Sequence, residues 1–392
     1  MSKRVGIEVS LGVSEAVKLT NTDCIAAYPI TPQTHIVEHL SEIVANGELD
    51  AEFIPVESEH SAMSVCCGCS AAGARTYTAT SSQGLALMSE IVYIVPSLRL
   101  PIVMTVADRS LSGPISIWND HTDVMSVRDC GWIQFFVENG QEAFDAHIQA
   151  FKITEDKRVL LPLMVHMDGF ILTHMIEPIE FLEQNEVDKF LNKNYEPLMQ
   201  LNPEKPVSMG PVGIPEIYTE AKKSHDELLQ DSKKVILEVW KEYGDMFGRY
   251  FKPVETYKNE DAEIVLVTMG SYSETATLAI NELRKEGEKA GLVKLRLWRP
   301  FPFEEFLNSV QGVKGVGVVD RAVTYGTSGG PVGIEIKNAL YDMDNKPVVS
   351  DFIAGLAGRD VTINDFKNMY YQTKEAVKKG RSLPYQFIGV RG

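Results

Sequence analysis

The fold is decided by residues 24–72, which read CIAAYPITPQTHIVEHLSEIVANGELDAEFIPVESEHSAMSVCCGCSAA. An apolar run at 24–28 stops at two prolines, and apolar residues at helical spacing follow at 33–44. A second apolar run at 53–56 precedes a helix of small residues that begins near Glu59. Because strand and helix alternate, this stretch predicts an α/β fold, in which helices cover both faces of a parallel sheet.

The same alternation extends along the rest of the chain, with one interruption. Several prolines and a charged helical stretch at 216–246 mark a connector with a helix at 177–260. We therefore expect a first α/β domain at 1–176 and a second at 261–392. The expected further strands are 75–80, 100–107, 159–166, 264–269, 292–297, 316–319 and 348–353, and the expected further helices are 84–95, 141–153, 274–286, 329–340 and 363–378.

Composition and charge exclude several classes of protein. The chain has 392 residues, of which 38 are lysine or arginine and 54 are aspartate or glutamate, so its formal net charge is −16. A basic face is needed to bind nucleic acid, so nucleic acid is not expected as a partner. Uncharged apolar stretches such as 91–98 are far shorter than the ~20 residues that cross a bilayer. The first residues lead into no signal-peptide core, so we expect no membrane segment and a cytoplasmic protein.

The five cysteines, Cys24, Cys66, Cys67, Cys69 and Cys130, do not form a disulfide framework. Their number is odd and no signal peptide precedes them. Cys66 and Cys69 have the spacing of a metal or redox motif, but no second pair lies nearby. We favour the alternative, in which cysteine serves as a small apolar residue in a tightly packed helix. No metal site is expected in this chain, and an iron–sulfur cluster that needs four thiolates cannot be built from this local set.

Two polar motifs stand where a predicted strand gives way to a helix. Thr31 lies between two prolines that fix the backbone, and Glu59 opens the helix of small residues. Ligands of open α/β sheets bind at the carboxyl ends of strands, so both residues are candidates for a site. The alternatives are a rigid helix-entry turn capped by Thr31, and a carboxylate that only complements the helix dipole at Glu59.

Arg109 follows the apolar strand predicted at 100–107 and is one of few cations at this expected sheet edge. The planar guanidinium of arginine suits a carboxylate ligand, because it donates two parallel hydrogen bonds. The alternative is an ion pair with Asp108, Asp120 or Asp123. The usual phosphate-loop, dinucleotide, zinc-protease and serine-hydrolase motifs are missing from the sequence.

Several blocks of the sequence, in order, resemble one family. They are YPITP (28–32), ESEHSA (57–62), ATSSQG (79–84), LSGP (111–114), NDH (119–121), RPFP (299–302) and GLAGRD (355–360). The chain is similar to the alpha subunits of the anaerobic 2-oxoacid:ferredoxin oxidoreductases, and most similar to those of the pyruvate:ferredoxin oxidoreductases. The similarity covers almost the whole chain.

This resemblance implies a fold and an activity. Residues 1–176 would be the pyrimidine-binding domain of a thiamine diphosphate enzyme, and 261–392 a domain like the C-terminal domain of transketolase. The activity implied is the reversible oxidative decarboxylation of pyruvate, with coenzyme A and ferredoxin, to acetyl-CoA and CO₂. The alternatives are action on another 2-oxoacid (2-oxoglutarate or a branched-chain 2-oxoacid), a transketolase-like transferase, and a scaffold without catalysis.

The resemblance also implies partners, because the chain has no Gly-Asp-Gly motif. Family members place that motif, and with it the diphosphate and Mg²⁺, in a beta-type subunit. The [4Fe–4S] clusters would likewise lie in partner chains, so beta-, gamma- and delta-type subunits are expected in one complex.

Individual residues of this chain match functional positions of the family. Glu59 would hydrogen-bond the pyrimidine ring and be the catalytic carboxyl, and burial against the ring would raise its pKa. Thr31 and Arg109 would hold the substrate carbonyl and carboxylate, and Tyr28 and Pro29 would contact the cofactor.

Overall fold

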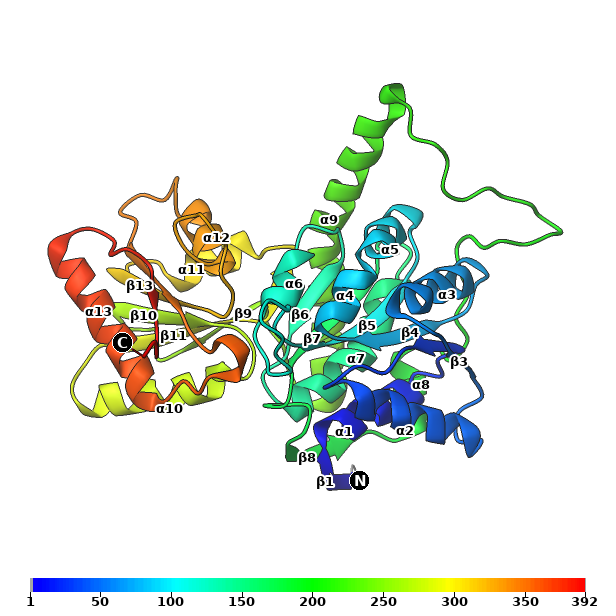
Figure 1. The fold of residues 1–392 in the computed structure, drawn as a ribbon, viewed down its shortest axis with the longest axis horizontal. Helices are drawn as coiled ribbons and strands as arrows, with labels where there is room; N and C mark the ends of the chain where they lie inside the picture. The colour runs from blue at the N-terminus through cyan, green and yellow to red at the C-terminus, as the bar shows by residue number, and fades with distance from the viewer. Residues whose placement is uncertain (1–2, 392) are drawn as a thin grey trace.

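Residues 3–391 are described by a computed structural model, in which two α/β lobes lie side by side (Figure 1). The first lobe is built on a seven-stranded sheet in the order β12-β6-β7-β5-β4-β2-β3, parallel except for the edge strand β12. Its strands are β2 (Cys24–Ala27), β3 (Glu52–Pro55), β4 (Thr76–Thr80), β5 (Ile102–Asp108), β6 (Ile133–Phe136), β7 (Leu163–Asp168) and β12 (Leu297–Arg299). All residues of β4, β5 and β7 are buried, as expected for a sheet with helices on both faces.

The helices of the first lobe include those predicted at 33–44, from Glu59 and at 141–153, and three with no prediction at 9–19, 122–126 and 184–190. They are α1 (Val9–Leu19), α2 (Thr34–Ala45), α3 (Glu59–Ala71), α4 (Ser82–Leu87), α5 (Ser89–Ile94), the 3-10 turn η1 (Val95–Leu98), α6 (Thr122–Ser126), α7 (Gly140–Glu155) and α8 (Gln184–Phe190). The prediction of one helix at 84–95 is wrong, because the chain breaks it at Met88. The ψ angle of Met88 is −2°, far from the helical value of about −42°.

A separate two-stranded antiparallel sheet joins two segments of the first lobe. It pairs β1 (Lys3–Glu8) with β8 (Ile176–Phe181). Neither segment is among the strands predicted from the sequence. The pairing joins residues far apart along the chain, so no local pattern announces it.

The second lobe contains a six-stranded sheet in the order β15-β14-β13-β10-β11-β9, with β9 antiparallel and the other strands parallel. Its strands are β9 (Val254–Tyr257), β10 (Ile264–Thr268), β11 (Ala290–Leu295), β13 (Gly315–Asp320), β14 (Val348–Ile353) and β15 (Gln386–Phe387). Its helices are α10 (Tyr272–Lys285), α11 (Phe303–Ser309), α12 (Pro331–Ala339), the 3-10 turn η2 (Leu356–Gly358) and α13 (Ile363–Lys379).

The 33-residue helix α9 (Pro215–Phe247) begins exposed to solvent, and its later turns pack against the first lobe. Its second half packs on α7 and buries Val235, Val239 and Trp240 in the core of that lobe. Residues 215–224 are all exposed, and Figure 1 shows the start of α9 standing away from both lobes. No helix of the described residues is both long enough and apolar enough to cross a membrane.

The two lobes are joined by the buried carboxylate of Asp168, at the end of β7. Ser271 of the second lobe donates its backbone N–H (2.8 Å) to this carboxylate, and Arg321 donates from its guanidinium. On the first-lobe side, Asn119 Nδ2 (2.7 Å) and His121 Nε2 (3.0 Å) contact the same carboxylate. Burial alone would raise the pKa of Asp168, but Arg321 and His121 outweigh it and hold that pKa below its ordinary value. The stabilisation is therefore present near neutral pH and is lost as the pH falls through this low pKa.

We expect Arg321→Met to destabilise the fold by about 3–5 kcal/mol, because it leaves the Asp168 charge buried without its main partner. Denaturant unfolding of the full chain measures this loss. Arg158→Met is the matched control, since Arg158 pairs with Asp156 and Glu238 on the exposed surface and its loss should change little. Equal unfolding midpoints for the two variants would show that Asp168 does not depend on Arg321.

Candidate active site

Four polar residues gather at one edge of the first-lobe sheet. Thr31 follows β2, Thr80 ends β4, Arg109 follows β5, and Glu59 opens α3 after β3. The order β5-β4-β2-β3 makes these strands neighbours, and their parallel direction brings all four carboxyl ends to the same edge. The structure therefore places the predicted residues where ligands of open α/β sheets bind.

The structure brings Arg109 and Thr31 into direct contact. The Arg109 guanidinium donates from Nη1 to the Thr31 carbonyl (2.9 Å) and from Nε to the Ser116 carbonyl (2.8 Å). Within residues 3–391 no carboxylate lies within ion-pair distance of this guanidinium, and its Nη2 group makes no hydrogen bond. The alternative of an ion pair with a neighbouring aspartate is therefore wrong. An uncommitted donor remains for a ligand.

Asp123 supports Arg109 through the backbone. Its Oδ2 atom accepts from the N–H groups of Arg109 (2.9 Å) and Ser82 (2.9 Å), and its Oδ1 accepts from Val124 (2.8 Å). Burial raises the pKa of Asp123 to about 7, against the lowering effect of these three bonds. Asp123 thus ties the turn after β5 to the turn after β4.

Glu59 is not the cap of its helix. That role belongs to Ser58, whose hydroxyl accepts from the Ser61 N–H (3.2 Å). The Glu59 side chain is buried to all but 7% of its surface, and no described residue forms a hydrogen bond or an ion pair with it. A carboxylate so enclosed, with no partner from the protein, is available to a ligand.

Gly84 makes the space that Glu59 occupies. A Cβ atom at this position would lie 2.5 Å from Thr80 Oγ1 and 2.8 Å from both Cγ and Oε1 of Glu59. The Thr80 hydroxyl oxygen is buried and has no hydrogen-bond partner in the described residues. Glu59 and Thr80 thus present two unsatisfied polar groups side by side, which a polar ligand could satisfy.

Gln33 fixes the turn after β2 through hydrogen bonds to two backbone carbonyls. The buried Gln33 side chain donates from Nε2 to the carbonyls of Tyr28 (2.8 Å) and Ala79 (3.4 Å), which joins this turn to β4. Tyr28, Pro29 and Thr31 themselves are exposed at the sheet edge. Their side chains are accessible to a ligand or to another chain.

Sequence reasoning missed a second group of buried polar residues beneath this edge. His166 Nδ1 lies 3.1 Å from Asp108 Oδ1, and both side chains are fully buried. Burial, with Asp123 and Asp168 nearby, raises the pKa of Asp108, while burial lowers that of His166. This buried pair lies beside the Asp168–Arg321 ion pair. No local signal could have found it, because its members belong to different strands.

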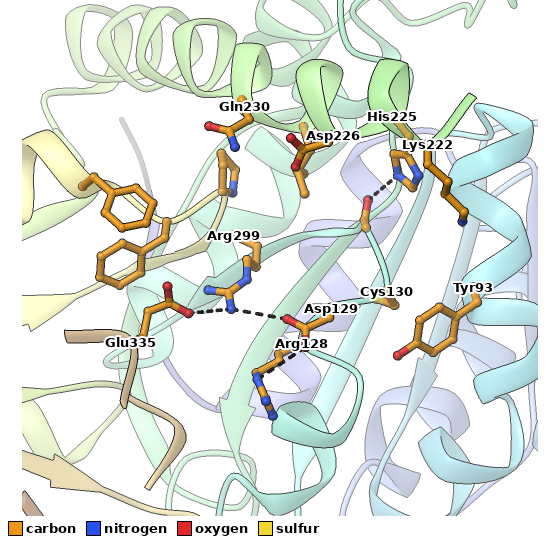
Figure 2. Close-up of a pocket in the computed structure, with 15 residues that line it drawn as sticks. Tyr93, Arg128, Asp129, Cys130, Lys222, His225, Asp226, Gln230, Arg299 and Glu335 are labelled. Carbon is orange, nitrogen blue, oxygen red and sulfur yellow. Dashed lines mark hydrogen bonds and ion pairs between the residues drawn. The ribbon is translucent and has the colours of Figure 1, made fainter. Parts of the chain in front are cut away.

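A cavity of about 520 Å³ lies elsewhere, between α9, the segment 128–131 and the segment 299–303 (Figure 2). In it Arg299 Nη2 lies between Glu335 (2.9 Å) and Asp129 (3.5 Å). Lysine and arginine are balanced there by equal numbers of acidic residues, and none of Glu59, Thr31 and Arg109 lines it. It is therefore distinct from the candidate site.

Comparison with protein families assigns most of the chain. Residues 15–241 match the family model of the pyruvate flavodoxin/ferredoxin oxidoreductases, thiamine diphosphate-binding. The chain belongs to this family. Residues 262–366 match core domain II of the pyruvate:ferredoxin oxidoreductases, so the resemblance inferred from the sequence blocks is confirmed in both lobes.

Curated family members match over nearly their full length. The pyruvate synthase subunit PorA of Methanocaldococcus jannaschii is 49% identical, over 94% of this chain and 95% of that protein. That of Thermotoga maritima is 47% identical over 92% and 91%. The ketoisovalerate oxidoreductase subunit VorA of Pyrococcus horikoshii is 45% identical over 91% and 90%.

Two solved structures confirm the predicted fold. The 2-oxoglutarate:ferredoxin oxidoreductase of Magnetococcus marinus superposes with a TM-score of 0.74 at 18% identity, covering 96% of this chain and 66% of that one. A split-gene transketolase superposes with a TM-score of 0.57 at 13% identity, covering 94% and 98%. At these identities the likeness concerns the fold alone.

The residues at the sheet edge fit one end of thiamine diphosphate. The unpartnered Glu59 carboxyl and Thr80 hydroxyl can satisfy the polar atoms of its pyrimidine ring. For the other end of the cofactor, the diphosphate, the sequence contains no Gly-Asp-Gly motif that would bind it together with Mg²⁺.

We expect Gly84→Ala to weaken thiamine diphosphate binding by the assembled enzyme, because the added Cβ displaces Glu59 and Thr80. Calorimetric titration with the cofactor measures the effect. Gly68→Ala is the matched control, since its Cβ on α3 would meet nothing within 4 Å. Unchanged cofactor affinity in Gly84→Ala would remove Glu59 from the site.

Proposed function

We propose that this chain is the PorA-type, or alpha, subunit of a pyruvate synthase. The enzyme catalyses the reversible oxidative decarboxylation of pyruvate, with coenzyme A, to acetyl-CoA and CO₂, and passes electrons to ferredoxin. The observation that carries the proposal is the uncommitted Arg109 donor beside Thr31, on the same sheet edge as the unpartnered Glu59. Three PorA proteins, 46–49% identical over nearly the whole chain, support it.

Arg109 binds the carboxylate of the 2-oxoacid substrate, and Thr31 binds its keto oxygen. The Arg109 Nη2 donor pairs with the carboxylate of the 2-oxoacid, while Nη1 and Nε stay bonded to backbone carbonyls and fix the guanidinium plane. The Thr31 hydroxyl donates to the keto oxygen. Because the Arg109 backbone is anchored on Asp123, the donor is positioned before substrate arrives.

Glu59 is the catalytic residue that this chain contributes. Its carboxyl oxygen exchanges a proton with a nitrogen of the pyrimidine ring, and Thr80, Tyr28 and Pro29 shape the surface beside that ring. Thiamine diphosphate, when bound, supplies the centre that accepts the electron pair of the broken carbon–carbon bond.

The remaining components come from partner chains. A beta-type subunit supplies the diphosphate and Mg²⁺ contacts, and gamma- and delta-type subunits complete a complex that holds the [4Fe–4S] clusters. Coenzyme A enters as co-substrate, and the complex works in the cytoplasm. The missing Gly-Asp-Gly motif and the lack of a four-cysteine set support this division of labour.

A second candidate substrate class is the branched-chain 2-oxoacids. It is favoured by one observation, the 45% identity to a ketoisovalerate oxidoreductase subunit. Both classes share the carboxylate and keto group that Arg109 and Thr31 bind, so these two residues do not discriminate between them.

We expect Arg109→Ala in the assembled enzyme to raise the KM for pyruvate ~10- to 150-fold, since a charge-assisted hydrogen bond contributes about 1.5–3 kcal/mol. Arg109→Lys keeps the charge without the planar fork and should recover only part of the loss. Ferredoxin reduction with pyruvate, 2-oxoglutarate and 2-oxoisovalerate measures the effect and ranks the substrates. Normal pyruvate kinetics together with a lower melting temperature would make Arg109 a structural residue.

We expect Glu59→Gln to preserve assembly while lowering turnover ~10²- to 10⁴-fold, the usual contribution of a general acid–base group. Exchange of the thiazolium proton of bound cofactor, followed by NMR after quenching, reports the step directly. Glu57→Gln is the matched control, because Glu57 is exposed and bonds only the neighbouring Ser61 hydroxyl. Wild-type exchange in Glu59→Gln would contradict the role given to this carboxyl.

A further inference from the structure

Two cysteines from different elements touch in the first lobe. Cys24 is the first residue of β2, and Cys69 lies in the last turn of α3. Their sulfur atoms are 2.6 Å apart, closer than two sulfurs that are merely in van der Waals contact. Both are free thiols in this structure.

The other cysteines have different surroundings. Cys66 is fully buried among apolar side chains, where it packs as a small apolar residue, as expected from the sequence. Cys67 is half-buried on α3, and Cys130 is buried beside Gln134. All five cysteines lie within the described residues, and only Cys24 and Cys69 are in sulfur–sulfur contact.

The two thiols of the pair differ in access to solvent. Cys24 is 3% exposed, whereas Cys69 is half-buried and borders the surface. Burial and the contact with Cys69 raise the pKa of the Cys24 thiol above its ordinary value. An oxidant from solvent therefore meets Cys69 first.

We propose that Cys24 and Cys69 are an oxidation site that forms a reversible disulfide when hydrogen peroxide reaches the chain. The Cys69 sulfur attacks one peroxide oxygen, the O–O bond breaks, and Cys69 becomes a sulfenic acid while the other oxygen leaves as water. The Cys24 sulfur then attacks the Cys69 sulfur, the S–O bond breaks, and a second water leaves with the Cys24 proton. Two thiols lose two electrons in all, and a dithiol reductant returns them.

The position of the bond determines what it does. Cys24 lies at the start of β2 and Cys69 at the end of α3, whereas Thr31 follows β2 and Glu59 begins α3. The disulfide would therefore clamp the strand to the helix at the edge opposite the candidate active site. It closes a loop of 45 residues, which restricts the unfolded chain and so stabilises the folded one.

Mapping the bond in the full wild-type chain tests the proposal. The chain, purified without oxygen, is treated with stoichiometric hydrogen peroxide, alkylated, and digested after glutamate. Trypsin is unsuitable, because no lysine or arginine lies between residues 19 and 74. We expect a linked pair of peptides, one ending at Glu38 and one beginning at His60, together with the loss of two thiols and their recovery with dithiothreitol. Five alkylated thiols after oxidation would overturn the proposal.

Variants identify the partners and the effect on stability. We expect the link to disappear in Cys24→Ala and Cys69→Ala and to persist in the matched control Cys67→Ala, whose cysteine lies on the same helix. Oxidation should raise the melting temperature of the wild type and of Cys67→Ala only. A link that survives in Cys69→Ala, or a wild-type melting temperature that oxidation leaves unchanged, would refute the assigned pair or its clamping role. These readouts do not depend on the proposed enzymatic function.

Discussion

The Asp168 carboxylate is buried between two lobes, and a buried charge is stable only when charged and polar donors surround it. Those donors come from both sides, because Arg321 and Ser271 belong to the second lobe and Asn119 and His121 to the first. The hydrogen bonds to this one carboxylate therefore fix the relative orientation of the two lobes. The second lobe also supplies β12 to the first-lobe sheet, so their separation would break a strand pair as well.

The candidate site depends on this junction through a single loop. Asn119 and His121 follow the segment whose Ser116 carbonyl holds Arg109, and Asp123 comes directly after them. The backbone of this loop is bonded to the second lobe too, with the Gly358 N–H donating to the Asn119 carbonyl (2.6 Å). The orientation of the Arg109 guanidinium thus depends on contacts that this loop makes with the second lobe.

The sequence predicts what is local in this structure. The apolar spacing of α2 and the mainly apolar run of β5 are visible in the order of residues alone, and so is the position of Glu59 at a strand-to-helix junction. The β1–β8 pairing and the contact between Asp168 and Arg321, 153 residues apart, leave no such pattern. Glu59 is a related case, since only the structure shows that Ser58 caps the helix and leaves the Glu59 carboxyl without a partner.

The first two turns of α9, residues 215–221, are all exposed, so their stability is close to that of an isolated helix. Short isolated helices are marginal in water, and their amide hydrogens exchange with solvent through local opening. At Trp240 and Tyr243 the same helix is buried, and exchange there requires much of the first lobe to open. Amide protection thus rises along one continuous helix. Any surface that comes to cover residues 215–221 would slow amide exchange there.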